Sequence, residues 1–164
     1  MKKIQKRRRR ENKTNYLARL KMLKSEKPRL VFRKTNSYII VQYVISEEAK
    51  DKIIFGTTSK ELLKKGWPEN FKGSLKSIPA SYLIGYFIAK KIQKDKLETP
   101  IVDLGMARKE HKSKPYAFLK GLIDAGLEIS CKEESFPEEE RIKGKNLKED
   151  FSKYFSEIKS KIDK

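Results

Sequence analysis

The sequence predicts a mixed α/β domain, in which a mixed sheet of meander strands plus a later strand is flanked by helices. A length of 164 residues suits one ordinary domain. Residues 29–34 alternate as a strand does and residues 38–45 are rich in β-branched and aromatic residues, whereas helical spacing dominates farther along. We expect a basic N-terminal extension over residues 1–13, the α/β domain over 14–131, and a charged linker with a C-terminal helix over 132–164.

The first half of the chain predicts one helix and then three strands. Residues 14–24 carry Tyr16, Leu17, Leu20 and Leu23 at helical spacing, and Pro28 ends this helix. The following segments are rich in β-branched and aromatic residues and are joined by short turns, so we expect an antiparallel meander. The expected strands span residues 29–34, 38–45 and 52–57.

Helices dominate the middle of the chain. Thr58 and Glu61 fit a capping box that opens a short helix closed by Gly66. Trp67 begins a loop and is expected to pack inward. A longer helix begins near Pro79, a residue favoured in a first turn. Its apolar stripe, which we assign to the core, consists of Ile78, Tyr82, Gly85, Tyr86, Ala89 and Ile92.

The last third predicts one buried strand and two helices. Residues 99–104 form the strand, residues 106–114 form a basic loop, and a helix runs from Pro115 to a cap at Gly126. Residues 127–131 have the composition of a fifth short strand, and residues 132–145 are charged and irregular. Asn146 and Glu149 are expected to cap a last amphipathic helix.

Positive charge is concentrated at the start of the chain. The formal net charge is +18, and residues 1–34 hold fifteen lysines and arginines but two acids. Residues 7–10 are four consecutive arginines, which repel one another unless phosphates neutralise them. This extension cannot build a core and should be disordered alone. The alternatives are a solvated tail or a basic localisation signal, but a polyanion partner is favoured.

The first hairpin combines groups that bind RNA. Arg33, Lys34 and Asn36 lie at its tip, and alternation allows Tyr38 and Gln42 to sit on an exposed sheet face. Lysine and arginine contact phosphates, while tyrosine and amide side chains recognise unpaired bases. An ordinary hairpin with charged edges is the alternative. A possible second RNA contact is the basic loop that carries Lys109, His111, Lys112 and Lys114.

The residues do not favour catalysis or a cofactor. His111 and Cys131 lack the pattern of a nucleophilic triad or a zinc site, and no phosphate-cradling glycine loop is present. Asp103 is expected to bond the following turn or neutralise a nearby base, which leaves a metal-dependent nuclease as a minor alternative. We expect no metal, no cofactor and no small-molecule substrate. The longest apolar run is too short for a membrane span, so a soluble, reduced, intracellular protein is expected.

A series of motifs resembles the archaeal branch of the ribosomal protein L-eighteen family, whose eukaryotic counterpart is ribosomal protein L-five. The series covers nearly the whole chain in the same order. It consists of Arg7-Arg8-Arg9-Arg10-Glu11, Lys13-Thr14-x-Tyr16, Arg19-Leu20, Leu23-Lys24-Ser25-x-Lys27-Pro28-Arg29-Leu30-Val31, Arg33-Lys34-x-Asn36, Pro79-x-Ser81-Tyr82-Leu83-x-Gly85, Asp103-Leu104-Gly105, Lys120-Gly121-x-x-Asp124-Ala125-Gly126-Leu127 and Arg141-x-x-Gly144.

The resemblance implies a non-catalytic constituent of the large ribosomal subunit in the cytoplasm. It implies binding to 5S rRNA, attachment of that RNA to 23S rRNA in the central protuberance, and contact with neighbouring large-subunit proteins. The alternative is a free-standing RNA chaperone or ribosome assembly factor. By motif, the resemblance assigns RNA binding to Arg7, Arg8, Arg9, Arg10, Lys13, Tyr16, Arg19, Lys24, Lys27, Arg29, Arg33, Lys34 and Asn36.

Overall fold

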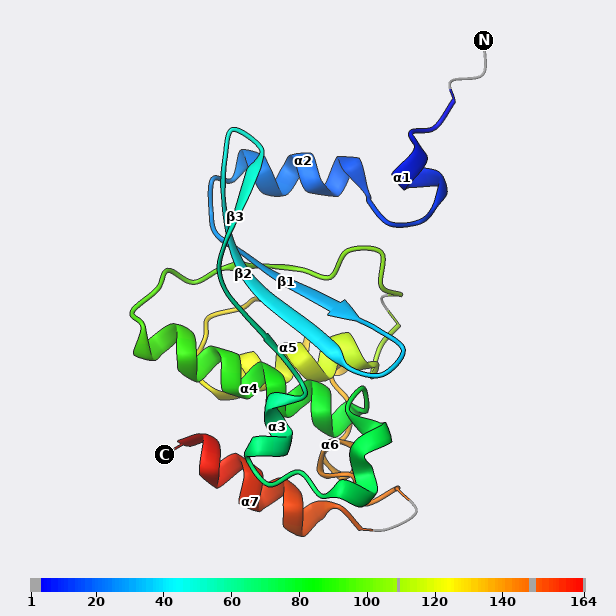
Figure 1. The fold of residues 1–164 in the computed structure, drawn as a ribbon, viewed down its shortest axis with the longest axis vertical. Coiled ribbons are helices and arrows are strands. Elements are labelled where there is room, and N and C mark those ends of the chain that lie inside the picture. Colours follow the sequence, from blue (N-terminus) through cyan, green and yellow to red (C-terminus); the bar gives the residue numbers. More distant parts are fainter. Residues whose placement is uncertain (1–3, 109, 148–149, 164) are drawn as a thin grey trace.

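The computed structural model describes residues 4–108, 110–147 and 150–163 and shows a mixed sheet covered by helices (Figure 1). The helices are α1 (Arg7–Arg10), α2 (Tyr16–Lys24), α3 (Glu61–Lys64), α4 (Ile78–Lys94), α5 (Lys114–Asp124), α6 (Glu139–Lys143) and α7 (Ser152–Asp163). The strands are β1 (Arg29–Lys34), β2 (Ile39–Glu47), β3 (Lys50–Thr58) and β4 (Ile101–Asp103). The predicted mixed α/β class is confirmed.

The four strands form one sheet in the order β3-β2-β1-β4. The two hairpins are antiparallel, and β4 joins the free edge of β1 in parallel. Parallel pairing places Val31 beside Asp103, so the carboxyl ends of β1 and β4 lie next to each other. A bulge between Tyr43 and Val44 leaves both side chains buried. The predicted meander and later strand are therefore present.

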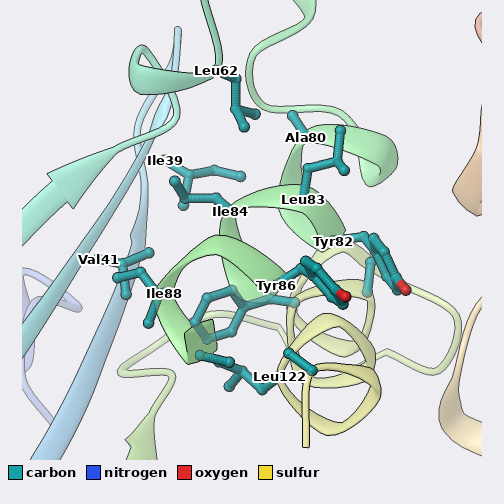
Figure 2. Packing of buried hydrophobic residues seen from close by; sticks show 14 of the residues in the cluster. Ile39, Val41, Leu62, Ala80, Tyr82, Leu83, Ile84, Tyr86, Ile88 and Leu122 are labelled. Atoms are coloured by element: carbon teal, nitrogen blue, oxygen red, sulfur yellow. The ribbon is translucent and has the colours of Figure 1, made fainter. Parts of the chain in front are cut away.

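Helix α4 lies at the centre of the core. Figure 2 shows Ile84 and Ile88 directed toward Ile39 and Val41 of β2, and all four side chains are buried. Ser77 caps the helix by accepting a hydrogen bond from Ala80 N at 3.3 Å. The predicted stripe is incomplete, because the sheet, α5 and α7 together bury α4 on nearly every side.

The tyrosines of α4 are core residues, as predicted, and also bind the neighbouring helices. Tyr82 and Tyr86 lie on the side of α4 away from the sheet (Figure 2). Tyr82 Oη donates to Asp124 of α5 at 2.8 Å, and Tyr86 Oη donates to Asp163 of α7 at 2.7 Å. Burial, followed by the Asp163 carboxylate, raises the pKa of Tyr86 to about 12. These bonds fix α5 and α7 against α4.

Helices α4 and α5 approach closely at two glycines. A β-carbon at Gly85 would lie 2.4 Å from Phe118 O, and one at Gly121 would lie 2.2 Å from Tyr82 O. Such distances are far inside van der Waals contact, so only glycine permits this backbone separation. The close packing of α4 and α5 therefore explains the glycine in each of two family-like motifs, the one that ends at Gly85 and the one that begins with Lys120-Gly121.

The C-terminal helix completes the same core. Trp67 packs inward as predicted, 4.5 Å from the ring of Phe151, which is fully buried. Phe155, Ile158 and Ile162 form the buried face of α7. Among the described residues, no helix has the length and apolar character needed to cross a membrane.

Several local predictions were wrong. Thr58 ends β3 and does not cap α3, whose N-cap is Lys60 without a side-chain bond. Residues 127–131 form no strand, because β1 pairs with β2 and β4 on its two edges and this segment has no strand partner. Residues 132–145 contain the 3-10 helix Glu133–Ser135 and α6. The expected cap Glu149 lies outside the described residues, and Asp150 instead accepts from Ser152 N at 2.9 Å.

Candidate nucleic-acid interface

The N-terminal arm presents its arginines at the surface. The single turn α1 buries no side chain. Arg8 Nε donates to Thr14 Oγ1 at 2.9 Å, and Arg9 Nη1 donates to Met106 Sδ at 3.5 Å. The second contact joins the arm to a loop almost a hundred residues away in sequence. The arm therefore lies against the folded domain and leaves its charge accessible to phosphates.

The segment between the arm and α2 also exposes its predicted RNA-binding groups. Glu11 ion-pairs with Lys13 at 2.9 Å and with Arg7 at 3.8 Å, but all these partners are surface groups. Tyr16 is exposed, and Lys6 Nζ lies 4.8 Å from the centre of its ring. The positions of Lys13 and Tyr16 are thus compatible with the sequence-based assignment.

Helix α2 stands beside the tip of the β2–β3 hairpin, away from the main helical layer (Figure 1). The predicted helix is confirmed, but it buries no residue. Arg19 Nη2 donates to Asp51 Oδ2 at 2.9 Å and so connects α2 to this hairpin. Lys24 and Lys27 are exposed near the C-terminal end of α2. Of these three candidates, Arg19 is already engaged by the protein.

Arg29 is a structural residue, which corrects its assignment to the RNA surface. Its side chain is 2 % exposed. The guanidinium donates to Asp51 Oδ1 at 2.6 Å and to Ser46 Oγ at 2.9 Å, and it lies 3.9 Å from Asp103 Oδ2. Two carboxylates therefore compensate its charge inside the protein, and a phosphate cannot reach it.

Arg33 is held in a fixed orientation at the end of β1. Its Nη1 donates to the carbonyl oxygens of Phe32 and Asp103, both at 2.8 Å, and its Nη2 donates to Asp103 Oδ2 at 2.8 Å. Asp103 Oδ1 also accepts from Gly105 N at 2.8 Å. The prediction that Asp103 bonds the following turn or neutralises a base is confirmed in both respects. Its carboxylate is thus occupied by arginines and the turn.

Lys34 and Asn36 are exposed at the tip of the β1–β2 hairpin. Thr35 closes this turn, because its Oγ1 donates to Tyr38 O at 2.7 Å and accepts from Tyr38 N at 3.0 Å. The Asn36 carbonyl accepts a hydrogen bond from Lys76 Nζ. The Asn36 side chain remains at the surface, where a sequence-predicted base contact is sterically possible.

Tyr38 and Gln42 are not the exposed pair that alternation suggested. Tyr38 precedes β2 and packs against the core, with Lys60 Nζ 4.6 Å from the centre of its ring. Gln42 is half-buried on β2, where its side chain lies over Gly56 of β3. We therefore leave Tyr38 out of the interface and keep Gln42 as a partly accessible amide.

The loop predicted as a second contact is basic and partly ordered by its own interactions. Its first candidate, Lys109, lies outside the described residues. The exposed ring of His111 stacks on Tyr116 at 5.9 Å with an interplanar angle of 5°. Lys112 Nζ forms a 2.7 Å ion pair with Glu138. Lys114 begins α5 and is half-buried.

The arm, the end of β1 and this loop meet around one cleft of about 960 Å³. Among the described residues that line it, Glu110 is the one acidic side chain, and the cations are Arg8, Lys13, Arg33, Lys34, Arg108, Lys112, Lys114 and Arg141. Partial burial, and then the nearby charges of Lys34 and Lys76, lower the pKa of Lys114. The cleft is therefore a concentrated positive site suited to an anion.

Comparison with known proteins identifies the family of this chain. A model of the family described as "Ribosomal large subunit proteins 60S L5, and 50S L18" matches residues 2–100. The chain is also 44 % identical over 145 residues to the large ribosomal subunit protein uL18 of Korarchaeum cryptofilum (strain OPF8). This match covers 88 % of the chain and 72 % of the relative. The chain belongs to the uL18 family.

Membership of the uL18 family makes this a protein of the large ribosomal subunit and confirms the resemblance seen in the sequence. The structure divides the family-like motifs into two groups. Arg29, Gly85 and Gly121 act inside the fold, and Asp124 at the surface accepts the hydrogen bond of Tyr82. The arginines of α1, together with the lysines near the hairpin tip, lie at the surface.

The uL18-family chain shows no arrangement that favours the nuclease alternative. Within residues 4–108, 110–147 and 150–163, no three histidine, cysteine, aspartate or glutamate side chains could hold a metal ion. Burial raises the pKa of the Cys131 thiol, which disfavours the reactive thiolate. His111 instead stacks on Tyr116.

Sequence reasoning missed Lys76, Arg108 and Arg141 as members of the basic surface. Lys76 is in the connection before α4, and Arg141 is in α6, so neither lies near the hairpin in sequence. Arg108 belongs to the loop predicted as basic but was not singled out. The motif Arg141-x-x-Gly144 was the one sequence signal for Arg141, and it did not indicate where in the fold this side chain lies.

Proposed function

We propose that this protein binds 5S rRNA and attaches it to 23S rRNA in the central protuberance of the large subunit. The observation that carries the proposal is the basic cleft, which gathers the arm, the hairpin tip and the 106–114 loop into one surface. Lys34 and Lys114 have no carboxylate within 4.0 Å among the described residues that could neutralise them. An RNA backbone would supply the missing negative charge.

The arrangement also suits contact with two RNA segments. Arm residues 7, 8 and 10 are exposed on α1, whereas Lys34, Asn36 and Lys114 lie on the folded domain. One segment can therefore bind on the domain while another follows the arm. We assign 5S rRNA to the domain surface, 23S rRNA to the arm, and no catalytic step to either.

The proposal is tested by a binding titration against 5S rRNA and a tRNA, each at low and near-physiological salt. We expect 5S rRNA to bind at least about a hundredfold more tightly at the higher salt, a difference of about 2.7 kcal/mol. If both RNAs bind with equal affinity, and both affinities fall equally as salt rises, the binding is a non-specific attraction to the arm. A 23S rRNA fragment captured only when both 5S rRNA and protein are present would support the bridging role.

The alternative of a free-standing chaperone or assembly factor makes a different prediction. A constituent protein stays with large subunits through a moderate-salt wash, whereas an assembly factor leaves mature particles. We expect the protein to stay with the large subunit. Recovery only with immature particles would favour the alternative.

A further inference from the structure

The guanidinium of Arg33 has one donor edge occupied and one face open. Its hydrogen bonds to Phe32 O, Asp103 O and Asp103 Oδ2 are all 2.8 Å long. These bonds use three of the five guanidinium N–H donors and leave the Nε–H and one Nη2–H for a ligand. The side chain is nevertheless 42 % exposed. It therefore offers a ligand its flat surface as well as these two donors.

Gly105 supports the other face of the same group. A β-carbon at Gly105 would lie 2.8 Å from Arg33 Cζ and Nη1 and 3.1 Å from Nη2. These nearly equal distances show that the guanidinium lies flat against the glycine. Gly105 has a φ of 61°, a backbone conformation that glycine adopts without strain. The guanidinium is therefore a rigid plate with one face covered by Gly105, and Arg33 lines the cleft.

The cleft combines apolar walls with cations, which is the composition of a small-ligand site rather than a purely electrostatic surface. Its apolar lining consists of Phe32, Ile78, Leu104, Met106, Ala107 and Pro115. Lys34 and Lys114 lie on the lining with charge available for a phosphate. Ser113 also lines the cleft, and its Oγ is buried without a hydrogen-bond partner among the described residues. A phosphate alone would leave the apolar walls and this hydroxyl unused.

Resting on the proposed RNA-binding function, we propose that the cleft holds one unpaired nucleotide splayed out of the RNA. The base stacks on the free face of the Arg33 guanidinium, and its phosphate lies between Lys34 and Lys114. Ser113 Oγ bonds a polar edge of the base or the sugar. The exposed His111 ring, held against Tyr116, provides a second stacking surface at the rim.

The test compares a ten-nucleotide RNA that carries 2-aminopurine at its centre, either single-stranded or annealed to its complement. Arg33→Lys keeps the charge but removes the plate, and Ala107→Trp fills the cleft without changing charge. We expect each variant to bind the single strand about tenfold more weakly, to lose the 2-aminopurine fluorescence change of the wild type, and to bind the duplex unchanged. Lys94→Arg, a charge-preserving change at an exposed position of α4 outside the cleft, is the matched control and should leave both affinities unchanged.

Two results would overturn the inference. One is a single-strand affinity that survives in both cleft variants, and the other is an equal fall for single strand and duplex, which would indicate a general electrostatic contact. Thermal melting of each variant checks that the fold is intact. If Arg33→Lys does not fold, the test rests on Ala107→Trp. No 5S rRNA is used, so failure here and failure of the 5S titration are separate results.

Discussion

Replacing Arg29 with methionine should destabilise the protein without altering its contact with RNA. Methionine keeps an unbranched apolar stem but removes a guanidinium whose side chain is 2 % exposed. Removing one partner of a buried ion pair costs about 3–5 kcal/mol. The lower end applies because Asp51 keeps its bonds from Arg19 and Ser46, while Asp103 keeps Arg33.

A second effect reduces this cost. Arg29 Nε is buried without a hydrogen-bond partner among the described residues, so its removal recovers about 1 kcal/mol of desolvation. The net loss is then about 2 kcal/mol, which shifts the urea midpoint by roughly 1 M if the denaturant slope is about 2 kcal/mol/M. Urea unfolding followed by circular dichroism measures this shift.

The RNA measurement separates a structural role from a phosphate contact. With Arg29→Met, the slope of log K against log salt for 5S rRNA should equal that of the wild type. The comparison variant Lys34→Gln should reduce the slope by about 0.7–0.9 and leave the urea midpoint unchanged. If Arg29→Met flattened the slope without affecting stability, the assignment of Arg29 to the interior would be refuted.

Three further predictions concern the arm, the helix contact and pH. Deleting residues 1–12 should weaken RNA binding and reduce the slope of log K against log salt. Tm should stay nearly unchanged, because α1 buries no residue. A large fall in Tm would show that the arm supports the fold. Gly121→Ala should cost about 2 kcal/mol in urea unfolding by forcing α4 and α5 apart, whereas Gly73→Ala, which meets nothing within 4 Å, should have little effect; a stabilised Gly121 variant would contradict this packing. Burial alone would raise the pKa of Asp51, but hydrogen bonds from its serine and arginine neighbours lower this pKa below its ordinary value. The ionised carboxylate therefore stabilises the fold above about pH 4, and this stabilisation is lost as the pH falls through the folded-state pKa. Asp51→Asn should therefore lose less stability than wild type between pH 5 and pH 3, and equal losses would exclude this linkage.

The main elements could be predicted because their signals are local. Strand-like composition and short turns identified the meander, and helical spacing with Pro79 and Gly126 located α4 and α5. Residues 127–131 have a strand-like composition but form no strand, since a strand needs a free edge to pair with. Tyr38 and Gln42 lie on the less buried face of β2, as alternation suggested, but both are half-buried, because Tyr38 packs against the core and Gln42 lies over Gly56.

Composition and spacing by themselves determined that this chain folds as a mixed α/β domain with a basic arm that favours an anionic partner. Only the tertiary structure decided which basic side chains are accessible to an anionic partner. Arg29 and Arg33 are four residues apart on the same side of β1, yet the β2–β3 hairpin tip and α2 lie over the former and a cleft opens beside the latter. Lys34, Lys76 and Lys114 come together because the hairpin tip, the segment before α4 and the start of α5 meet in space. Charge on a sequence is a local property, whereas its neutralisation depends on which distant carboxylates the fold brings within reach.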